Sequence, residues 1–186
     1  MRQPTTARQP TPRNAYLETI EETPGPFVFA VDDTGALLAL KFLDGDYEQC
    51  IEQELERMGY RVQAAPDASQ TAQARQQFLE YCAGARQTFD LPLALAGTEW
   101  QKTVWRALRE IPFGETRAYG EIALQVGRPL AARAVGRANA TNPIPLVIPC
   151  HRVVGANGAL TGFGGGLHIK TRLLAHEARI RRMDTA

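Results

Sequence analysis

A cysteine followed directly by a histidine is the pair of residues in this sequence that is best suited to covalent chemistry. Cys150 and His151 lie in the segment PCHRVV, residues 149–154. A thiol reacts as a nucleophile only in its thiolate form, and a neighbouring imidazole can take up its proton near neutral pH. The alternative is a buried structural cysteine beside a surface histidine, because free cysteines pack well in cores. The residues around the pair favour the first interpretation.

The run NPIPLVI, residues 142–148, precedes this pair and is predicted to be stiff. Its two prolines hold Asn142 and Ile144 away from helical geometry. The apolar residues 146–148 that follow are expected to form a buried strand. Ordinary packing does not require such an irregular segment, so we interpret it as the support that delivers the thiol of Cys150.

A carboxylate on the last predicted helix is the third candidate for the chemistry. Lys170, two leucines and Glu177 share one face of this helix, at spacings i, i+3, i+4 and i+7. One interpretation is a surface ion pair between Lys170 and Glu177. In the other, Glu177 points inward to His151, because a buried carboxylate needs a donor or a countercharge. Cys150, His151 and Glu177 would then act as nucleophile, base and orienting group.

Two short helices between residues 119 and 140 are predicted to form a helix-turn-helix, with the turn at residues 127–129. The second helix is expected to open at Pro129, a position that tolerates proline. Its residues are almost all small, which leaves little beyond Arg133, Arg137 and Asn139 to read base edges. It is either a tightly packed core helix or a helix whose backbone lies close to DNA, with Arg133 entering the duplex.

The first ninety residues are predicted to form a small α+β unit without visible chemistry. The expected elements are strands at residues 27–31, 36–42 and 60–64, with a hairpin turn at residues 32–35, and helices at residues 46–58 and 69–83. Along the second helix, the predicted stripe comprises Ala72, Arg75, Phe78, Leu79 and Cys82. Cys50 and Cys82 fall on these helices and are interpreted as packing residues. Residues 89–97 are expected to be a linker, after which Thr98 and Gln101 match a capping box.

The composition fits one or two compact domains and argues against several classes of protein. The chain has 186 residues, of which 44% are hydrophobic and 22% charged. No apolar stretch approaches the length of a membrane span, and no secretory signal is visible. Three cysteines do not make a disulfide framework, so a reducing cytoplasm is the expected location. No histidine precedes His151 and no CxxC occurs, so no metal site is expected.

The motifs of residues 97–178, taken together, resemble one known family. They are Gly97-Thr98 with Trp105, IPFGET at residues 111–116, Tyr119-Gly120, AARAVG at residues 131–136, Asn142-Pro143, PCHRV at residues 149–153, and Leu173-Leu174 followed by Glu177. Their types and order are similar to those of the O6-alkylguanine-DNA alkyltransferases, also called methylated-DNA–protein-cysteine methyltransferases. The N-terminal third shows only a general likeness to the family.

The resemblance implies an α+β fold with two domains. The N-terminal domain would be similar to ribonuclease H in topology. The C-terminal domain would be a winged-helix-like unit that carries the helix-turn-helix and enters the minor groove of DNA. On this basis we expect a disordered tail at residues 1–15, an N-terminal α+β domain at residues 16–92, and a DNA-binding and alkyl-acceptor domain at residues 93–182.

The resemblance also implies which residues react. Cys150 looks like the alkyl acceptor. His151, acting through a water molecule, and Glu177 match the residues that deprotonate the thiol. Asn142 matches the residue that braces the turn carrying the thiol.

Further residues match those that handle the DNA. Tyr119 resembles the tyrosine whose hydroxyl contacts the extruded guanine, and Arg133 the arginine that fills the gap left in the stack. Backbone groups near Val153 and Gly164 match positions that read the guanine edge. Phe163 stands where many members have a tyrosine over the pocket, so one polar contact is lost there.

The function implied by the resemblance is repair of DNA by direct damage reversal. The protein would bind double-stranded DNA bearing O6-alkylguanine, flip the base out, and transfer the alkyl group irreversibly to Cys150, with O4-alkylthymine left open as a second lesion. It would act as a monomer in the cytoplasm, on the nucleoid if bacterial, without cofactor, metal, membrane or required protein partner. The alternatives are a non-catalytic lesion-binding relative, a Cys-His peptidase and a helix-turn-helix regulator. Cys150 argues against the first, and the small-residue helix with Arg133 argues against the second.

Overall fold

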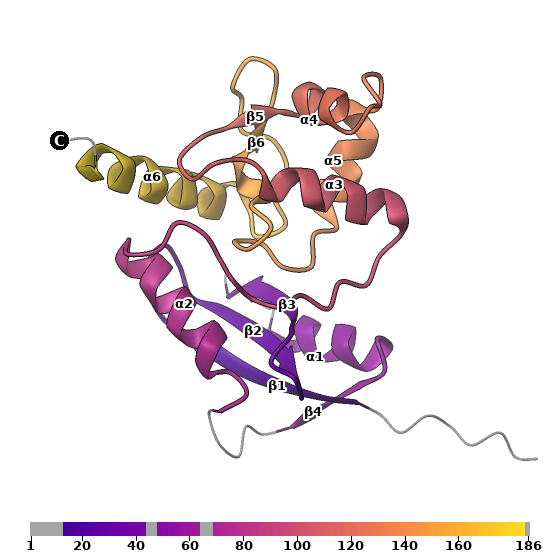
Figure 1. The fold of residues 1–186 in the computed structure, drawn as a ribbon, viewed down its shortest axis with the longest axis vertical. Coiled ribbons are helices and arrows are strands. Elements are labelled where there is room, and N and C mark those ends of the chain that lie inside the picture. The colour runs from indigo at the N-terminus through magenta and orange to yellow at the C-terminus, as the bar shows by residue number, and fades with distance from the viewer. Residues whose placement is uncertain (1–12, 44–47, 64–68, 185–186) are drawn as a thin grey trace, which may run out of the picture.

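A four-stranded sheet forms the N-terminal half of the chain (Figure 1). The computed structural model describes residues 13–43, 48–63 and 69–184. The strands are β1 (Arg13–Ile20), β2 (Phe27–Asp32), β3 (Leu37–Phe42) and β4 (Tyr60–Gln63), in the order β3-β2-β1-β4. Strands β1, β2 and β3 pair antiparallel, and β4 lies parallel to β1. Strand β3 is therefore an edge strand of this sheet.

The hairpin predicted between β2 and β3 is confirmed. The side chain of Asp32 accepts hydrogen bonds from the backbone N–H of Thr34 and of Ala36, and Gly35 takes a positive φ of 78°. This is a turn in which an aspartate bonds to the backbone just ahead of it and glycine supplies the left-handed position.

Helices cover both faces of the sheet, as the alternation of side chains in β2 requires. On one face, Phe27 and Phe29 pack against Phe78 of α2 (Ala72–Ala83). On the other face, Val28 shares a core cluster with Ile51 of α1 (Glu48–Arg57). Both helices were expected from the sequence, and glycines with positive φ follow them at positions 59 and 84, as predicted.

The stripe of α2 residues predicted from the sequence is shifted by one position along the helix relative to the residues that are buried in the structure. The buried positions are Ala74, Gln77, Phe78 and Tyr81, whereas Arg75 is exposed and Cys82 half-buried. Polar residues take core positions here because they have partners. Gln77 makes two hydrogen bonds with the backbone of Asp90. Cys82 does pack against the core, while the side chain of Cys50 lies outside the described part of the structure.

The C-terminal half is mainly helical. Its elements are α3 (Glu99–Arg109), β5 (Arg117–Ala118), α4 (Tyr119–Gln125), α5 (Ala132–Ala140), the 3₁₀ turn η1 (Cys150–Arg152), β6 (Val153–Val154) and α6 (Leu167–Asp184). Strands β5 and β6 pair in parallel. The predicted capping box is confirmed, because Thr98 Oγ1 accepts from Gln101 N–H and Gln101 Oε1 accepts from Thr98 N–H.

Three boundaries differ from the sequence-based expectations. Helix α5 begins at Ala132 and not at Pro129, because residues 128–131 form a turn closed by a hydrogen bond from Ala131 N–H to Arg128 C=O. Residues 146–148 are buried but form turns instead of a strand, and Leu146 has a φ of 82°. Strand β1 begins at Arg13, so residues 13–15 are not in a tail. The rest of that predicted tail lies outside the described residues.

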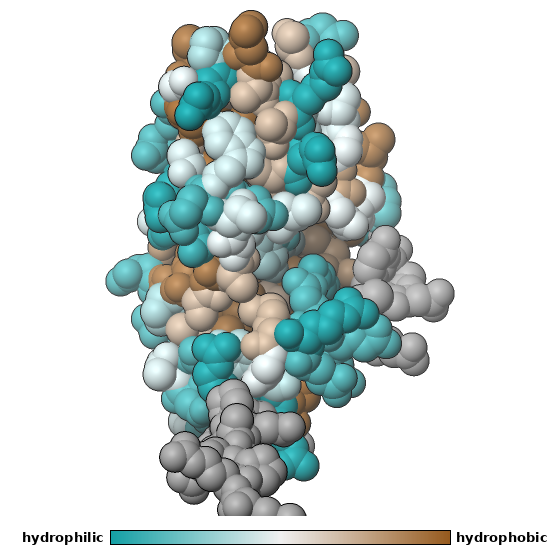
Figure 2. All heavy atoms as spheres, turned by 90° about the vertical axis from the view of Figure 1, so that its right-hand side faces the viewer, coloured by the Kyte–Doolittle hydropathy of each residue, from teal (hydrophilic) through white to brown (hydrophobic). Residues whose placement is uncertain are grey.

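The two halves share one core and are joined along the free edge of β3. The largest cluster of buried apolar residues contains side chains from both halves. Leu37 of β3 exchanges backbone hydrogen bonds with the linker, and Leu40 N–H donates to the carbonyl of Pro143 at 2.8 Å. On the face seen in Figure 2, apolar residues gather near mid-height, the level at which the halves meet in Figure 1. Within the described chain, no helix is long and apolar enough to cross a membrane.

Candidate active site

The loop of residues 142–149 presents Cys150 at the start of η1. Asn142 holds this loop by both sides of its amide. Its Nδ2 donates to the carbonyl of Ile148 at 2.7 Å, and its Oδ1 accepts from the N–H of Ile144 at 3.0 Å. These bonds, together with the contact of Pro143 to β3, account for the turns found where a strand was predicted. The thiol of Cys150 is thereby placed at a fixed point, with the residue only 4% exposed.

Glu177 is the centre of a buried network of hydrogen bonds. Its Oε1 accepts from His151 Nε2 at 2.8 Å, from Arg152 Nη2 at 3.0 Å and from the hydroxyl of Tyr81 at 2.9 Å. Its Oε2 accepts from Arg152 Nε at 3.0 Å and from Gly114 N–H at 2.9 Å. Burial alone would raise the pKa of Glu177, but the hydrogen bonds and charges of His151 and Arg152 outweigh it and hold this pKa well below its ordinary value.

The network determines which nitrogen of His151 is free to act as a base. Because Nε2 faces the ionised carboxylate of Glu177, we assign the ring proton of neutral His151 to Nε2 and the lone pair to Nδ1. Nδ1 is buried and has no hydrogen-bond partner among the residues that the structure describes. Burial, more than any other effect, lowers the pKa of His151. The imidazole is thus neutral at rest and carries an unused acceptor.

The thiol of Cys150 is also neutral at rest. Burial raises its pKa to about 11, although the hydrogen bond from Asn142 and the charge of Lys170 act in the opposite direction. Among the described residues, no hydrogen bond joins the thiol to the imidazole of His151, whose backbone N–H instead donates to the sulfur. The structure therefore brings Cys150, His151 and Glu177 to one place, but the first two are not in direct contact as an ion pair.

Lys170 is buried and does not pair with Glu177, so the surface ion pair considered above was wrong. Its Nζ donates to the carbonyls of Val153, at 2.6 Å, and Thr161, at 2.9 Å. These two bonds hold β6 and the following loop against α6. The spacing of Lys170 on an apolar stripe was visible in the sequence, but its two carbonyl partners were not.

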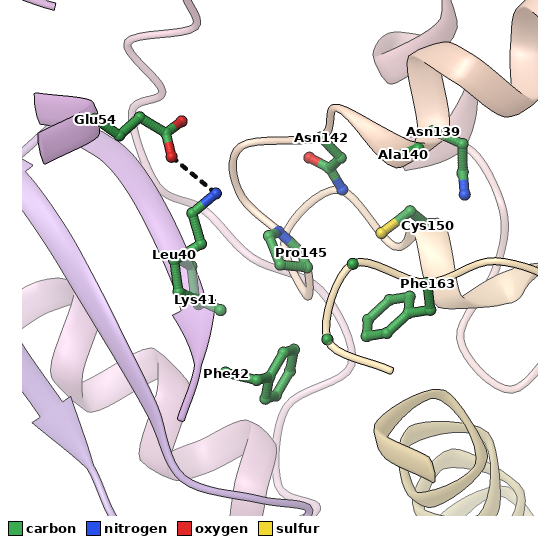
Figure 3. A pocket seen from close by; sticks show the side chains of 12 residues that line it. Leu40, Lys41, Phe42, Glu54, Asn139, Ala140, Asn142, Pro145, Cys150 and Phe163 are labelled. Carbon is green, nitrogen blue, oxygen red and sulfur yellow. Dashed lines mark ion pairs between the residues drawn. The ribbon is translucent and has the colours of Figure 1, made fainter. Parts of the chain in front are cut away.

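A cavity of about 210 Å³ opens beside Cys150 (Figure 3). From the C-terminal half it is lined by Asn142, Phe163 and Gly164, and from the N-terminal half by residues 40–42 of β3. The ring of Phe163 lies 6.1 Å from that of Phe42, centroid to centroid. Three of the predicted site residues, Asn142, Phe163 and Gly164, therefore lie with Cys150 around one cavity.

Tyr119 and Arg133 lie on the helix-turn-helix, outside this cavity lining. Tyr119 opens α4, is half-buried, and has its hydroxyl 3.5 Å from the carbonyl of Thr161. A Cβ added at Gly136 would lie 3.7 Å from the ring of Tyr119. Arg133 is exposed, and its side chain makes no contact with another described residue by hydrogen bond or ion pair. Helix α5 buries Val135 on its other face. Small residues therefore occur both on the side of this helix that packs against the core and on its more exposed side.

Several residues of the network were not found from the sequence. Tyr81 was placed outside the buried stripe of α2, and its partner Glu177 is 96 residues away along the chain. Arg152 lies inside the PCHRVV segment, but nothing in that motif assigns it to a carboxylate. Asn139 was noted only as a polar residue of the small-residue helix, yet it lines the cavity.

The chain was compared with known families and curated proteins. The family model described as "6-O-methylguanine DNA methyltransferase, DNA binding domain" matches residues 99–179. A methylated-DNA–protein-cysteine methyltransferase of Methanosarcina acetivorans is 45% identical over 162 residues, which cover 87% of this chain and 97% of that protein. The protein of that name from Mycobacterium tuberculosis is 44% identical, with 87% and 92% covered. This chain belongs to the methylated-DNA–protein-cysteine methyltransferase family.

Solved structures agree with this assignment. The crystal structure of Mycobacterium tuberculosis O6-methylguanine methyltransferase matches with a TM-score of 0.74 at 42% identity and covers 89% of this chain and 93% of its own. A structure of that family member with DNA matches with the same score at 41% identity, over 90% and 94%. The Pyrococcus kodakaraensis enzyme, at 24% identity and a TM-score of 0.62, shares the fold. The α+β fold expected from the sequence is thus confirmed.

The raised pKa of Cys150 predicts how its reactivity depends on pH. With a thiol pKa of about 11, the rate of alkylation by iodoacetamide should keep rising with pH through pH 10, and should not level off near the ordinary cysteine pKa of about 8.5. Peptide mapping by mass spectrometry separates Cys150 from the other cysteines, and the urea-unfolded chain gives the ordinary profile. A plateau below pH 8 in the folded protein would instead indicate a preformed thiolate.

A second prediction concerns the charge of Glu177. Glu177→Gln leaves the buried guanidinium of Arg152 without a countercharge, so the free energy of unfolding should fall by about 3–5 kcal/mol. In the native chain, the contribution of ionised Glu177 to the free energy of unfolding is fully present above the ordinary glutamate pKa of about 4.3. It is lost as the pH falls toward the lower pKa that Glu177 has in the folded state. Urea denaturation of the native chain and the variant at pH 7 and at about pH 3 measures both effects, since the difference between the two proteins should shrink below the ordinary glutamate pKa.

Glu115→Gln is the matched control for this experiment. Glu115 pairs with Arg117 and Arg181 at the surface, at 3.0 and 3.4 Å. Exposed pairs of this kind contribute less than about 1 kcal/mol. Equal losses for the two variants would show that the network around Glu177 is not the stabilising feature that its geometry indicates.

Proposed function

We propose that this protein repairs DNA by direct damage reversal, in which the alkyl group of O6-alkylguanine in double-stranded DNA is transferred to Cys150 in a single turnover. The observation that carries the proposal is the arrangement at Cys150 in a member of this family. The thiol lies beside a cavity, near a neutral imidazole whose Nδ1 is unpartnered and whose Nε2 is held by Glu177. This is the arrangement of a nucleophile, a base and an orienting carboxylate.

His151 takes the proton of Cys150 through its free Nδ1. Because no hydrogen bond joins the thiol to the imidazole, one water molecule between these two groups completes the path, as general-base catalysis allows. The carboxylate of Glu177 then stabilises the imidazolium. The ammonium of Lys170 favours the thiolate, since its charge lowers the pKa of Cys150. Asn142 acts as a positioning residue that holds the loop and donates toward the sulfur.

The transfer forms one bond and breaks one. The thiolate of Cys150 attacks the alkyl carbon, an S–C bond forms, and the C–O6 bond breaks with its electron pair going to the guanine. Tyr119 donates a proton to the departing base. The proton that His151 took from the thiol then replaces the one that Tyr119 gave up, so both residues return to their neutral forms. The products are S-alkylcysteine and unmodified guanine. A thioether is not hydrolysed under these conditions, so each protein molecule reacts once.

The helix-turn-helix supplies the contact with DNA. A solved relative is a complex with DNA. In α5 the small residues Ala132, Gly136 and Ala140 are partly or fully exposed beside Arg133, and small residues let a backbone lie close to a groove. Arg133 projects from that face and enters the space of the extruded nucleotide. We place this domain at residues 93–182, after an N-terminal domain at residues 16–92.

The guanine is held between Tyr119 and the loop of Phe163. The backbone at Gly164 is open, because a Cβ added there would meet nothing within 4 Å. The carbonyl of Val153 accepts from Lys170, and a carbonyl oxygen can accept a second hydrogen bond, here from an amino group of the base. All of these groups lie on one chain, and we propose that it acts as a monomer. A DNA substrate places the protein in the compartment of the chromosome.

Mass measurement of the intact protein tests the transfer to Cys150. After incubation with duplex DNA containing O6-methylguanine, the native chain should gain the mass of one methylene unit per molecule, mapped to the peptide of Cys150. Cys150→Ser should gain nothing while still binding the duplex, because the thiol reacts and does not dock. Cys82→Ser is the control and should react as the native chain does. A methyl group found on Cys50 or Cys82 would refute the assignment.

Replacement of Arg133 separates insertion into the duplex from other roles. Arg133→Ala should slow methyl transfer from duplex DNA by at least about tenfold, because filling the gap offsets an unstacking cost of a few kcal/mol. Transfer from free O6-benzylguanine needs no extrusion and should be slowed far less. Arg137→Ala, an exposed arginine of the same helix, is the matched control.

The salt dependence of these rates distinguishes the remaining explanations. A phosphate contact would weaken all duplex binding and lower the salt slope by about one unit. Equal slowing of Arg133→Ala on free base and on duplex would mean that Arg133 supports the pocket or the fold, and the insertion role would be abandoned.

A further inference from the structure

Tyr81 is a buried titratable residue that the proposed transfer does not use. It lies on α2, in the N-terminal half, and its side chain is fully buried. The rings of Phe89, Phe113 and His176 lie 5.4 to 6.1 Å from its own ring, centroid to centroid. Held between them, Tyr81 donates a hydrogen bond from its hydroxyl to Glu177 Oε1 at 2.9 Å. A group from the N-terminal half therefore reaches the carboxylate that orients the base.

The hydroxyl of Tyr81 and the imidazole of His151 donate to the same carboxylate oxygen. Oε1 of Glu177 accepts from His151 Nε2 at 2.8 Å and from the Tyr81 hydroxyl at 2.9 Å. Burial, together with the charge of Glu177, raises the pKa of Tyr81 well above its ordinary value, so the hydroxyl keeps its proton and remains a donor. A donor on Oε1 stabilises the negative charge there and makes the oxygen a weaker acceptor for the imidazole.

The carboxylate of Glu177 has enough other donors to keep its orientation when one hydroxyl is removed. Arg152 donates to Oε1 through Nη2 and to Oε2 through Nε, both at 3.0 Å, and Gly114 N–H donates to Oε2 at 2.9 Å. A guanidinium bound to both oxygens fixes the plane of a carboxylate. Loss of the Tyr81 hydroxyl alone therefore changes mainly the charge on Oε1.

We propose that the Tyr81 hydroxyl sets the basicity of His151 through Glu177, because by sharing Oε1 it weakens the attraction of the carboxylate for the imidazolium. The inference rests on the proposed transfer, in which His151 is the base. Tyr81 does not line the cavity beside Cys150 and acts only through Glu177. Its effect is to keep the imidazole neutral, with Nδ1 free, at pH values where a stronger pair of Glu177 and His151 would already bind a proton.

Several other groups act on the same proton equilibrium. The titratable or charged side chains that surround the pair in the described structure are Tyr81 and Cys82 of α2, Cys150, His151 and Arg152 of η1, and Lys170, His176 and Glu177 of α6. Burial lowers the pKa of His151 most, Glu177 raises it, and the charges of Arg152 and Lys170 lower it. Tyr81→Phe alters Oε1 without changing the formal charge of any member of this set, which makes it a clean test.

The experiment compares the titration of His151 in the native chain and in Tyr81→Phe. Removal of the hydroxyl should raise the titration midpoint of the imidazole by about 0.5 pH unit, which is about a threefold change in its protonation equilibrium. NMR of the imidazole against pH measures this midpoint in the folded protein without substrate, and His151→Gln assigns the signal by its absence. Where the imidazole is neutral, benzyl transfer from free O6-benzylguanine should become about threefold faster, because a stronger base takes the thiol proton more readily.

Tyr16→Phe is the matched control. Tyr16 belongs to the same core, and its hydroxyl donates to the carboxylate of Asp33 at 2.9 Å, so this variant loses the same group from the same kind of partner within the N-terminal sheet. The midpoint of His151 should stay at its native value. Replacement of Tyr81 alone by 3-fluorotyrosine, whose acidified hydroxyl is a stronger donor, should move the midpoint in the opposite direction, to lower pH.

The outcomes separate tuning from support of the fold. A midpoint that is unchanged or lowered in Tyr81→Phe would overturn the inference, whether or not transfer became slower, and so would an equal rise in Tyr16→Phe. A raised midpoint without faster transfer would leave the inference standing and count against His151 as the base of the proposed function. Absence of transfer by the native chain would count against that function alone, since the NMR titration needs no substrate.

Discussion

The buried carboxylate of Glu177 is the interaction on which both the fold and the chemistry depend. It receives hydrogen bonds from α2 through Tyr81, from the loop after α3 through Gly114, and from η1 through His151 and Arg152. Such a charge is tolerated in a core only when its lone pairs are occupied and its charge is paired. Because one donor comes from the N-terminal half, the halves cannot separate without leaving the carboxylate short of a partner. The orientation of the base thus depends on the junction of the two halves.

The same burial keeps the reacting groups uncharged until substrate arrives. It raises the pKa of Cys150 and lowers the pKa of His151, so both are neutral at rest. In the proposed mechanism, proton transfer between them creates an ion pair, and two fixed charges are already in place to stabilise it, Glu177 for the imidazolium and Lys170 for the thiolate. A protein that uses its thiol once gains from this order of events, since a neutral buried thiol reacts slowly with other electrophiles. The charge is generated where the alkyl group is bound.

Features with local causes were predictable from the sequence, and features with distant partners were not. The hairpin at Asp32, the capping box at Thr98 and the inward direction of Glu177 follow from residues close together in the chain or from a periodic stripe. The phase of α2 was wrong because Gln77 is held by the backbone of Asp90 in the following linker, and Tyr81 by Glu177, 96 residues away along the chain. Residues 146–148 looked like a strand because apolar periodicity does not report side-chain hydrogen bonds, and the amide of Asn142 closes this segment into turns. The amphipathic position of Lys170 was visible, but its carbonyl partners were not.

The N-terminal half carries none of the reacting groups, yet it shapes their surroundings through the edge of β3. An edge strand offers unpaired backbone groups, and here they bond to the linker and, through Leu40, to Pro143 in the loop that presents the thiol. The next residues along β3 line the cavity, where Phe42 faces Phe163. The residues proposed to make and break bonds thus belong to the C-terminal half, whereas the size of the cavity beside the sulfur of Cys150 depends on both halves. A change in the β3 edge can alter which alkyl groups fit without touching the thiol, the imidazole or the carboxylate.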